Sequence, residues 1–242
     1  MKILVTGVGG QLGHDVMNEL IGRGHTGVGS DIAPEYSGVA DGSAVTTAEY
    51  VPMDITDAAQ VSEVITKVSP DVVIHCAAWT AVDAAEDDDK KAKVKAINAD
   101  GTQNIANVCK QLDCKMVYIS TDYVFDGQGE TPWEPDCKDY KPLNVYGETK
   151  LAGELAVSNT LDKYFIVRIA WVFGVNGKNF IKTMLRLGKE RGAVSVVNDQ
   201  IGSPTYTYDL SKLLVAMIQT DKYGRYHATN EGLCSWYEFA CE

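Results

Sequence analysis

The chain has 242 residues, of which 45% are hydrophobic and 23% are charged, a balance that is typical of a soluble globular protein, and this length suits one large α/β domain or a domain with a small appendage. Its net charge of −11 argues against nucleic acid or an anionic membrane surface as a partner. No apolar run is long enough to span a membrane and no signal peptide is recognisable, so we expect a cytoplasmic protein.

Apolar runs typical of strands alternate along the chain with segments of helical periodicity. The expected strands are Lys2–Thr6, Thr26–Asp31, Tyr50–Met53, Val72–Cys76, Lys115–Ser120, Tyr164–Ala170 and Val194–Val197. The expected helices are Gln11–Ile21, Ala58–Val68, Lys90–Gln111, Asn144–Ser158, Asn179–Glu190 and Tyr208–Thr220. Runs rich in β-branched residues and separated by helices predict a parallel sheet that is buried on both faces. The expected fold class is α/β, with a doubly wound parallel sheet of the Rossmann type.

A glycine-rich turn follows the first expected strand. Gly7, Gly10 and Gly13 stand where the strand ends and the first helix begins. Glycines at these places allow a tight turn, a close approach to a pyrophosphate and close packing of helix on strand. The first helical residues, Gln11 and Leu12, would present free N–H groups to the anion. The pattern predicts a dinucleotide site.

The ends of the second and third strands offer residues for the adenosine half of a dinucleotide. Asp31 is placed to accept hydrogen bonds from the adenosine ribose. Its neighbours Ile32 and Ala33 are not basic, so we expect NADH to be favoured over NADPH. Asp54 and Ile55 follow the third strand and are expected to flank the adenine.

Small residues follow the fourth expected strand. They are Cys76, Ala77 and Ala78, and they would let a cofactor lie flat across the edge of the sheet. The six cysteines have irregular spacing and are expected to be free thiols. The four histidines are scattered, so we expect no metal site, and His75 is expected to be a core residue or to support the site from behind rather than to be a catalyst.

Two residues of one expected helix carry the predicted chemistry. Tyr146 and Lys150 are four positions apart and share a helix face, so a nearby ammonium is expected to lower the pKa of the phenol. Thr121, at the end of the fifth strand, is expected to polarise a substrate carbonyl together with Tyr146. A second pair with the same spacing, Tyr208 and Lys212, is expected to lie on a surface helix.

These motifs together resemble the extended short-chain dehydrogenase/reductase superfamily, in which Thr121, Tyr146 and Lys150 would form the catalytic triad. Asn98 resembles the helix asparagine of that superfamily, and Tyr146, Lys150 and Asn98 would help to hold the cofactor. Further blocks resemble the dTDP-4-dehydrorhamnose reductases. These blocks are Ala77–Asp83 with Glu86, Ser120–Gly127, Arg168–Gly174, Asn179-Phe180 and Asp199–Thr205.

The resemblance implies a function and a substrate pocket. NADH or NADPH would deliver hydride to C4 of a dTDP-linked 4-keto-6-deoxy sugar while Tyr146 protonates the C4 oxygen, a step in making dTDP-L-rhamnose for cell-wall polysaccharide. The residues implied for the sugar pocket are Thr80, Val82, Tyr123, Val124, Trp171, Gln200, Ser203 and Thr205. The resemblance also leads us to expect a single domain over residues 1–242, with a substrate lobe mainly from residues 171–242. That lobe is expected to be incomplete, because the family continues beyond this point, and a homodimer is a candidate assembly.

Two other functions share parts of this pattern. A nucleotide-sugar 4,6-dehydratase or epimerase has the same fold and the Tyr-x-x-x-Lys pair, but dehydratases place an acid where this chain has Tyr123. A non-catalytic regulatory subunit that resembles the β subunit of methionine adenosyltransferase would also keep the fold. Oxidation of the cofactor by a sugar nucleotide would exclude this second alternative.

Overall fold

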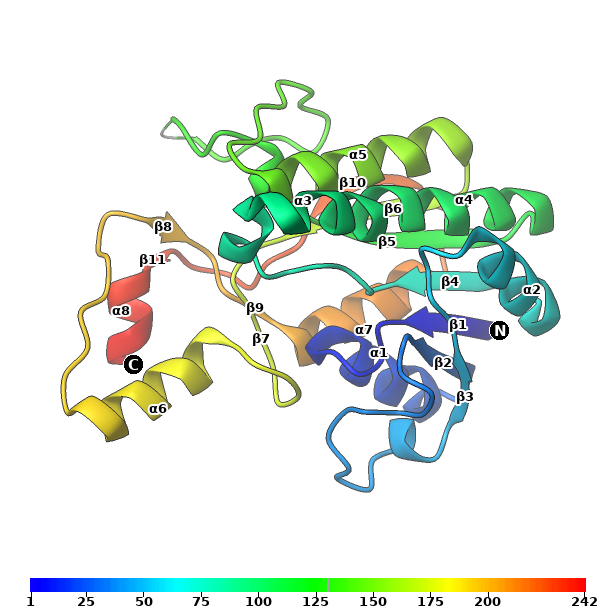
Figure 1. Ribbon diagram of the computed structural model, residues 1–242, viewed down its shortest axis with the longest axis horizontal. Coiled ribbons are helices and arrows are strands. Elements are labelled where there is room, and N and C mark those ends of the chain that lie inside the picture. Colours follow the sequence, from blue (N-terminus) through cyan, green and yellow to red (C-terminus); the bar gives the residue numbers. More distant parts are fainter. Residues whose placement is uncertain (130) are drawn as a thin grey trace.

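A seven-stranded parallel sheet forms the centre of the computed structural model, which describes residues 1–129 and 131–242 (Figure 1). The strands are β1 (Lys2–Thr6), β2 (Thr26–Asp31), β3 (Glu49–Pro52), β4 (Val72–His75), β5 (Lys115–Thr121), β6 (Tyr164–Ile169) and β10 (Gly224–His227). They lie in the order β10-β6-β5-β4-β1-β2-β3, and every neighbouring pair is parallel. The chain winds outward in both directions from the β1–β4 pair, which confirms the expected doubly wound fold.

Helices cover both faces of this sheet (Figure 1). One face carries α1 (Gln11–Gly22) and α7 (Thr207–Met217), and the other carries α2 (Ala58–Val68), α4 (Gly101–Leu112) and α5 (Val145–Thr160). Successive side chains of a strand point to opposite faces, so Leu4 and Val5 of β1 are both fully buried in different apolar clusters. This two-sided burial explains why the central strands read as continuous apolar runs.

The segment expected to be one helix over Lys90–Gln111 contains a wider turn. It consists of α3 (Asp88–Lys95), a π-helical turn η3 (Ala96–Asp100) and α4. A π turn holds an additional residue and often occurs at functional sites. Here the turn directs the buried Asn98 toward the loop after β4, where its side-chain oxygen accepts a hydrogen bond from Trp79 N at 2.8 Å.

Two expectations about strands need correction. The strand expected at Val194–Val197 is wrong, because this segment pairs with no strand among the described residues and half of Val197 is exposed. The edge strand β10 was not expected, because Gly224–His227 has no continuous apolar run. The backbone of β10 pairs with β6, and the sequence pattern of Gly224–His227 does not predict this pairing.

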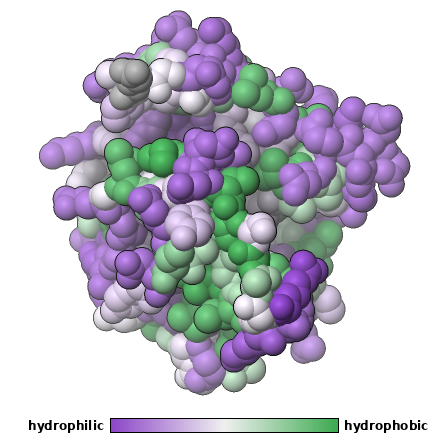
Figure 2. All heavy atoms as spheres, turned by 90° about the vertical axis from the view of Figure 1, so that its left-hand side faces the viewer, coloured by the Kyte–Doolittle hydropathy of each residue, from purple (hydrophilic) through white to green (hydrophobic). Residues whose placement is uncertain are grey.

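A small lobe lies at one end of the sheet, on the left in Figure 1. It contains α6 (Phe180–Arg191), α8 (Trp236–Cys241) and the short pairs β7–β9 (Val172–Phe173 with Thr205–Tyr206) and β8–β11 (Ile201–Gly202 with Cys234–Ser235). The Trp171 and Trp236 rings stack at 3.6 Å between centroids. Figure 2 faces this end and shows a strip of hydrophobic residues surrounded by hydrophilic ones. No helix in the described part of the chain is long and apolar enough to cross a membrane.

A buried ion pair ties α5 to the sheet. The guanidinium of Arg168 on β6 donates to both carboxylate oxygens of Glu154, at 2.9 and 2.8 Å, and both side chains are fully buried. Arg168 also donates to Pro135 O at 3.2 Å and to the Tyr140 hydroxyl at 3.3 Å, so it fixes the long connection between β5 and α5. A buried charge that loses its partner is strongly destabilising.

We therefore expect Glu154→Ala to lower the free energy of unfolding by about 3–5 kcal/mol, because it leaves the Arg168 charge buried and unpaired. Glu190→Ala is the matched control, since it breaks an exposed Arg186–Glu190 pair on α6 and should cost less than about 1 kcal/mol. Urea unfolding followed by circular dichroism measures both. Equal losses in the two variants would contradict the role given to the buried pair.

Candidate active site

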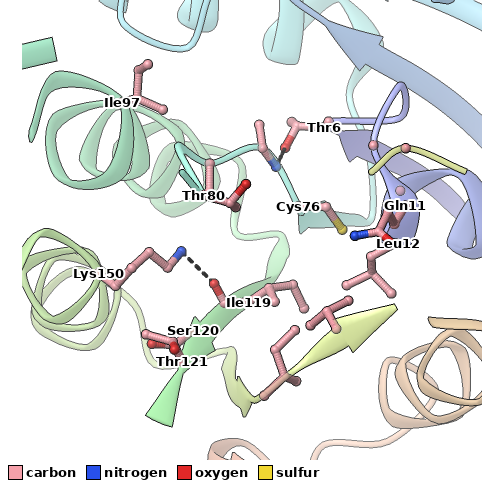
Figure 3. Close-up of a pocket in the computed structure, with 18 of the residues that line it drawn as sticks. Thr6, Gln11, Leu12, Cys76, Thr80, Ile97, Ile119, Ser120, Thr121 and Lys150 are labelled. Carbon is pink, nitrogen blue, oxygen red and sulfur yellow. Dashed lines mark hydrogen bonds between the residues drawn. The ribbon is translucent and has the colours of Figure 1, made fainter. Parts of the chain in front are cut away.

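A cavity of about 830 Å³ lies at the carboxyl ends of the central strands (Figure 3). It is lined by the ends of β1, β2, β4 and β5, by the start of α1, by α5 and by part of the lobe. This is the place where the strand order reverses between β1 and β4. Ligands of open α/β sheets bind at such a reversal.

The glycine turn at the start of α1 leaves no room for side chains. Gly7 has a φ of +71°, and a Cβ there would lie 2.6 Å from Ala77 N. A Cβ on Gly13 would lie 2.3 Å from Gly7 O, inside any real contact distance. Gly10 precedes the helix without a side-chain cap, so the first N–H groups of α1 are free to meet an anion.

The carboxylate of Asp31 braces this turn. Its Oδ2 accepts a hydrogen bond from Gly9 N at 3.0 Å, and its Oδ1 accepts one from Ile32 N at 2.8 Å. Asp31 lines the cavity, as do Asp54 and Ile55, which were predicted beside it. The acid therefore lines the cavity and also holds the glycine turn in shape.

Asn176, in the lobe, forms hydrogen bonds with the same glycine turn from the other side. The side-chain amide of Asn176 donates to Gly9 O at 3.0 Å and to Gly10 O at 3.1 Å. Its oxygen accepts a hydrogen bond from Val39 N at 3.0 Å. Asn176 is buried, so these hydrogen bonds replace the hydration that its amide loses on folding.

Helix α5 brings Tyr146 and Lys150 to the opposite wall. Asn144 caps this helix by accepting a hydrogen bond from Gly147 N at 2.7 Å. The buried ammonium of Lys150 donates to Ile119 O at 2.7 Å, as Figure 3 shows, and lies 4.1 Å from the centre of the Tyr118 ring. Both predicted residues of the pair therefore line one cavity.

The expected effect of Lys150 on Tyr146 needs correction. Burial raises the pKa of Tyr146, with a hydrogen bond from Thr121 opposing it and the charge of Asp122 adding to it. Burial lowers the pKa of Lys150 to about 7. Spacing alone predicted that the ammonium would favour a phenolate, but desolvation disfavours the charged form of both groups.

Thr121 stands at the end of β5 beside these groups. Its hydroxyl donates to Asp122 Oδ1 at 3.0 Å and accepts a hydrogen bond from Tyr123 N at 3.2 Å. The hydrogen that was expected to polarise a substrate carbonyl is thus directed at Asp122 in this structure. Burial raises the pKa of the Asp122 carboxyl.

Most residues predicted to hold a cofactor line the cavity. They are Gly7, Gly10, Gln11, Leu12, Gly13, Asp31, Asp54, Ile55, Cys76, Ala77, Ala78, Thr80, Tyr146 and Lys150. Asn98 lies behind the wall, where its amide donates to Trp79 O and to the Thr149 hydroxyl, both at 3.2 Å. It therefore positions the loop after β4 and helix α5 and does not face the cavity.

The residues predicted for the sugar pocket divide into two groups. Thr80, Val82, Tyr123 and Trp171 line the cavity. The other four lie outside it. Val124 is fully buried, Gln200 is exposed, Ser203 donates to Gly232 O at 2.8 Å, and the buried Thr205 donates to Ala170 O at 2.5 Å.

Several lining residues were not predicted. They include Ser30, Ser120, Asp122, Lys178 and Trp236. The hydroxyl oxygens of Ser30 and Ser120 are buried and have no hydrogen-bond partner in the described part of the chain. Ser30, Ser120 and Asp122 each stand next to a predicted residue, which was the available sequence signal, whereas Trp236 reaches the cavity through the packing of α8.

The described residues contain free cysteines at all six positions, as predicted, and no group of three His, Cys, Asp or Glu residues that could hold a metal ion. The buried His75 accepts or donates hydrogen bonds with Thr6 and Thr102, which confirms its place in the core. Tyr208 and Lys212 lie on the surface of α7, also as expected, with the ammonium 3.8 Å from the ring centre.

Comparison with known proteins finds relatives that are named as reductases of dTDP-linked sugars. The family model of the RmlD substrate binding domain matches residues 1–242. The chain is 38% identical to a dTDP-4-keto-6-deoxy-D-glucose reductase of Streptomyces niveus, over 98% of this chain and 75% of that protein. It is 37% identical to the dTDP-4-dehydrorhamnose reductase of Escherichia coli K12, over 99% of this chain and 76% of that protein.

Solved structures agree with the fold. A dTDP-4-dehydrorhamnose reductase of Bacillus anthracis in complex with NADP is 40% identical, with a TM-score of 0.84, over 99% of this chain and 78% of that chain. A UDP-glucose 4-epimerase of Brucella ovis in complex with NAD has a TM-score of 0.81 over 98% of this chain and 80% of that chain. The epimerase is 23% identical, so its likeness shows the fold alone.

We expect Gly13→Ala to abolish most dinucleotide binding, because a Cβ 2.3 Å from Gly7 O forces the turn open. Gly22→Ala, in the same helix, is the matched control, since a Cβ there meets nothing within 4 Å. Titration of NADPH fluorescence gives the dissociation constant of each variant. Unchanged affinity in Gly13→Ala would show that the turn does not hold the cofactor.

Lys150 should make the stability of the ligand-free protein depend on pH. Its folded pKa of about 7 lies below the usual 10.5, so between these values the unfolded chain binds a proton that the folded chain has lost. Stability relative to Lys150→Met should therefore rise as the pH increases from about 7 to about 10. Urea unfolding across this range measures it, with Lys95→Met on the exposed face of α3 as the control. If the stability of the wild type and of Lys150→Met changed with pH in parallel, this result would contradict the lowered pKa of the buried Lys150.

Proposed function

The chain belongs to the family of the RmlD substrate binding domain, and from this premise we propose that it is an NAD(P)H-dependent dTDP-4-dehydrorhamnose reductase. It reduces the 4-keto group of dTDP-4-dehydrorhamnose to give dTDP-L-rhamnose. The observation that carries the proposal is the meeting of Thr121, Tyr146 and Lys150 with the glycine turn around one cavity. We extend the proposal to a single cytoplasmic domain over residues 1–242, with a sugar nucleotide as substrate and residues 171–242 as the main source of the substrate lobe.

The cavity residues fit a nicotinamide dinucleotide. The glycine turn and the free N–H groups of α1 suit its pyrophosphate, and Asp31 suits the adenosine ribose. The hydroxyl groups of Ser30 and Ser120 line the cavity, are buried and have no partner among the described residues, so they are available to form hydrogen bonds with a bound dinucleotide. When bound, the reduced cofactor supplies the hydride for C4 of the sugar.

Tyr146 supplies the proton. Because burial raises its pKa, the phenol is protonated at neutral pH and acts as the general acid toward the C4 oxygen. Lys150 has a pKa of about 7, so a large share of it carries a charge near neutrality. That charge, four residues along the same helix, stabilises the phenolate that remains after proton transfer.

The lobe supplies the surface for the sugar. Trp171 and Trp236 line the cavity as a stacked pair, and an aromatic face suits the apolar face of a sugar ring. Thr80, Val82 and Tyr123 complete our proposed pocket from the other wall. Our proposed pocket leaves out the four residues that lie outside the cavity, which are Val124, Gln200, Ser203 and Thr205.

The choice between NADH and NADPH depends on Asp31. A carboxylate here favours a free ribose hydroxyl, and the lining residues beside it, Ser30, Ile32 and Asp54, include no cation. We therefore keep NADH as the favoured cofactor. The Bacillus anthracis relative was solved with NADP, so both cofactors belong in the assay.

A dehydratase would need an acid at the position of Tyr123. Burial raises the pKa of Tyr123 above its ordinary value near 10, so the phenol stays protonated near neutral pH and is unable to accept a proton as a carboxylate would. The reductase needs only the general acid Tyr146 and the hydride donor. The geometry therefore favours the reductase over the dehydratase.

We expect Tyr146→Phe to retain cofactor binding and to lose turnover by about 10²–10⁴-fold, because proton transfer to the substrate oxygen is lost. The assay follows the absorbance of NADH or NADPH in separate cuvettes with dTDP-4-dehydrorhamnose. Tyr208→Phe is the matched control, since it alters the second Tyr-x-x-x-Lys pair on the surface of α7. Full turnover by Tyr146→Phe would overturn the mechanism. Absence of turnover by the wild type with both cofactors would overturn the proposed function.

A further inference from the structure

Asn176 binds two successive carbonyl groups of the glycine turn. Its side-chain amide donates to Gly9 O at 3.0 Å and to Gly10 O at 3.1 Å, and the amide nitrogen carries a hydrogen for each bond. The side chain is only 2% exposed, so water hardly competes for these bonds. The lobe thus holds the backbone of the turn through a buried polar contact.

These hydrogen bonds determine the direction of the first N–H group of α1. The carbonyl of Gly10 and the N–H of Gln11 belong to one planar trans peptide unit, in which the two groups point in opposite directions. Because Gly10 O is held by Asn176, the N–H of Gln11 is also held, at a residue that lines the cavity (Figure 3). The peptide unit before it is fixed at both ends, since Gly9 O accepts from Asn176 and Gly10 N donates to Gly7 O at 3.0 Å.

The turn needs such restraints. Gly9 and Gly10 have no side chain to limit their backbone conformations, and no side chain caps α1 at Gly10. Asp31 restrains one side by accepting a hydrogen bond from Gly9 N at 3.0 Å, and Asn176 restrains the carbonyls on the other side. A site that already has its binding geometry loses less entropy when a ligand binds.

We propose that Asn176 is a positioning residue of the cofactor site, which holds the glycine turn in the form that binds the pyrophosphate. The affinity for a dinucleotide then depends on a residue of the lobe. This inference deepens the proposed function and rests on it, because it concerns the site proposed for the cofactor. Asn176 acts through Gly9 and Gly10 and through the N–H group that they direct.

Further hydrogen bonds hold Asn176 in place. Its side-chain oxygen accepts a hydrogen bond from Val39 N at 3.0 Å, so the loop between β2 and β3 is held by the same side chain. Asn179, three residues later, donates to Gln11 Oε1 at 2.9 Å and to Gly174 O at 2.8 Å. The segment that carries Asn176 is therefore joined to the start of α1 at two points.

The test compares ADP, which has two phosphate groups, with adenosine, which has none. Asn176→Leu keeps the branched shape of the side chain and adds no charge, but it removes the amide. We expect this variant to bind ADP about tenfold more weakly than the wild type, because the N–H of Gln11 is no longer held toward the phosphates. Its affinity for adenosine should stay the same. Isothermal titration calorimetry measures ADP, and competition with NADH measures adenosine.

Asn18→Leu is the matched control. Asn18 is on α1 and holds the same loop between β2 and β3, since its oxygen accepts a hydrogen bond from Val45 N at 2.8 Å. Its amide nitrogen lies 3.2 Å from His14 Nε2, so this side chain binds on the other side of the helix start from the cavity residues of the turn. Asn18→Leu should therefore bind ADP as the wild type does.

Turnover gives a second measurement that a loss of stability alone would not reproduce. Asn176→Leu should raise the KM for NADH about tenfold and leave kcat and the KM for the sugar nucleotide unchanged at saturating NADH. The reason is that Tyr146 and Lys150 come from α5 on the opposite wall of the cavity. If Asn176→Leu does not fold, Asn176→Ala also lacks the amide and takes its place.

Two results would overturn the role of Asn176. One is unchanged affinity of Asn176→Leu for ADP, and the other is an equal loss of affinity for ADP and for adenosine, which would place the effect outside the phosphate turn. A wild type that binds neither ADP nor NADH would instead overturn the proposed function, and this inference with it.

Discussion

The site depends on how closely helix α5 approaches the end of the sheet. A Cβ on Gly147 would lie 2.3 Å from Tyr123 O, and one on Gly153 would lie 2.2 Å from the Tyr118 hydroxyl oxygen. Any larger residue at either place would push the helix away from β5. Tyr146 and Lys150 are on the same helix, so their reach into the cavity depends on these two glycines.

The groups that this approach brings together form one polar row. Tyr146, Lys150 and Glu154 follow each other at intervals of four residues, which places them on one face of α5. The row meets Arg168 at one end and the cavity at the other. Burial raises the pKa of the phenol and lowers that of the ammonium for a single reason, because both lose their charged forms when water is removed.

The sequence was most predictive for residues whose place in the site is determined by their position along the backbone. The glycine turn and the residues that follow β1, β2 and β4 line the cavity as expected, because strand ends in a parallel sheet meet at one edge. It predicted least well what depends on packing between distant segments. Trp236 reaches the cavity through α8, while Thr205 points its hydroxyl at Ala170 O.

Electrostatics and local backbone form were also beyond the sequence pattern. The four-residue spacing of Tyr146 and Lys150 is visible in the sequence, but the direction of their pKa shifts depends on burial, which spacing does not show. The π turn that directs Asn98 inward could not be told from a regular helix, since periodicity over Lys90–Gln111 is similar in both. The strand expected at Val194–Val197 failed because an apolar run forms a strand only where a partner strand is available.

The composition of the buried side of α5 has a consequence for how this helix is held on the sheet. Its buried residues are Gly147, Thr149, Lys150, Gly153, Glu154 and Val157, of which only Val157 is a large apolar side chain. Burial of apolar side chains therefore contributes little to the docking of this helix, and its polar contacts are strong because β5 and β6 exclude water around them. Water that reached the inner face of α5 would weaken these contacts, so the placement of Tyr146 and Lys150 depends on a dry interface between the helix and the sheet.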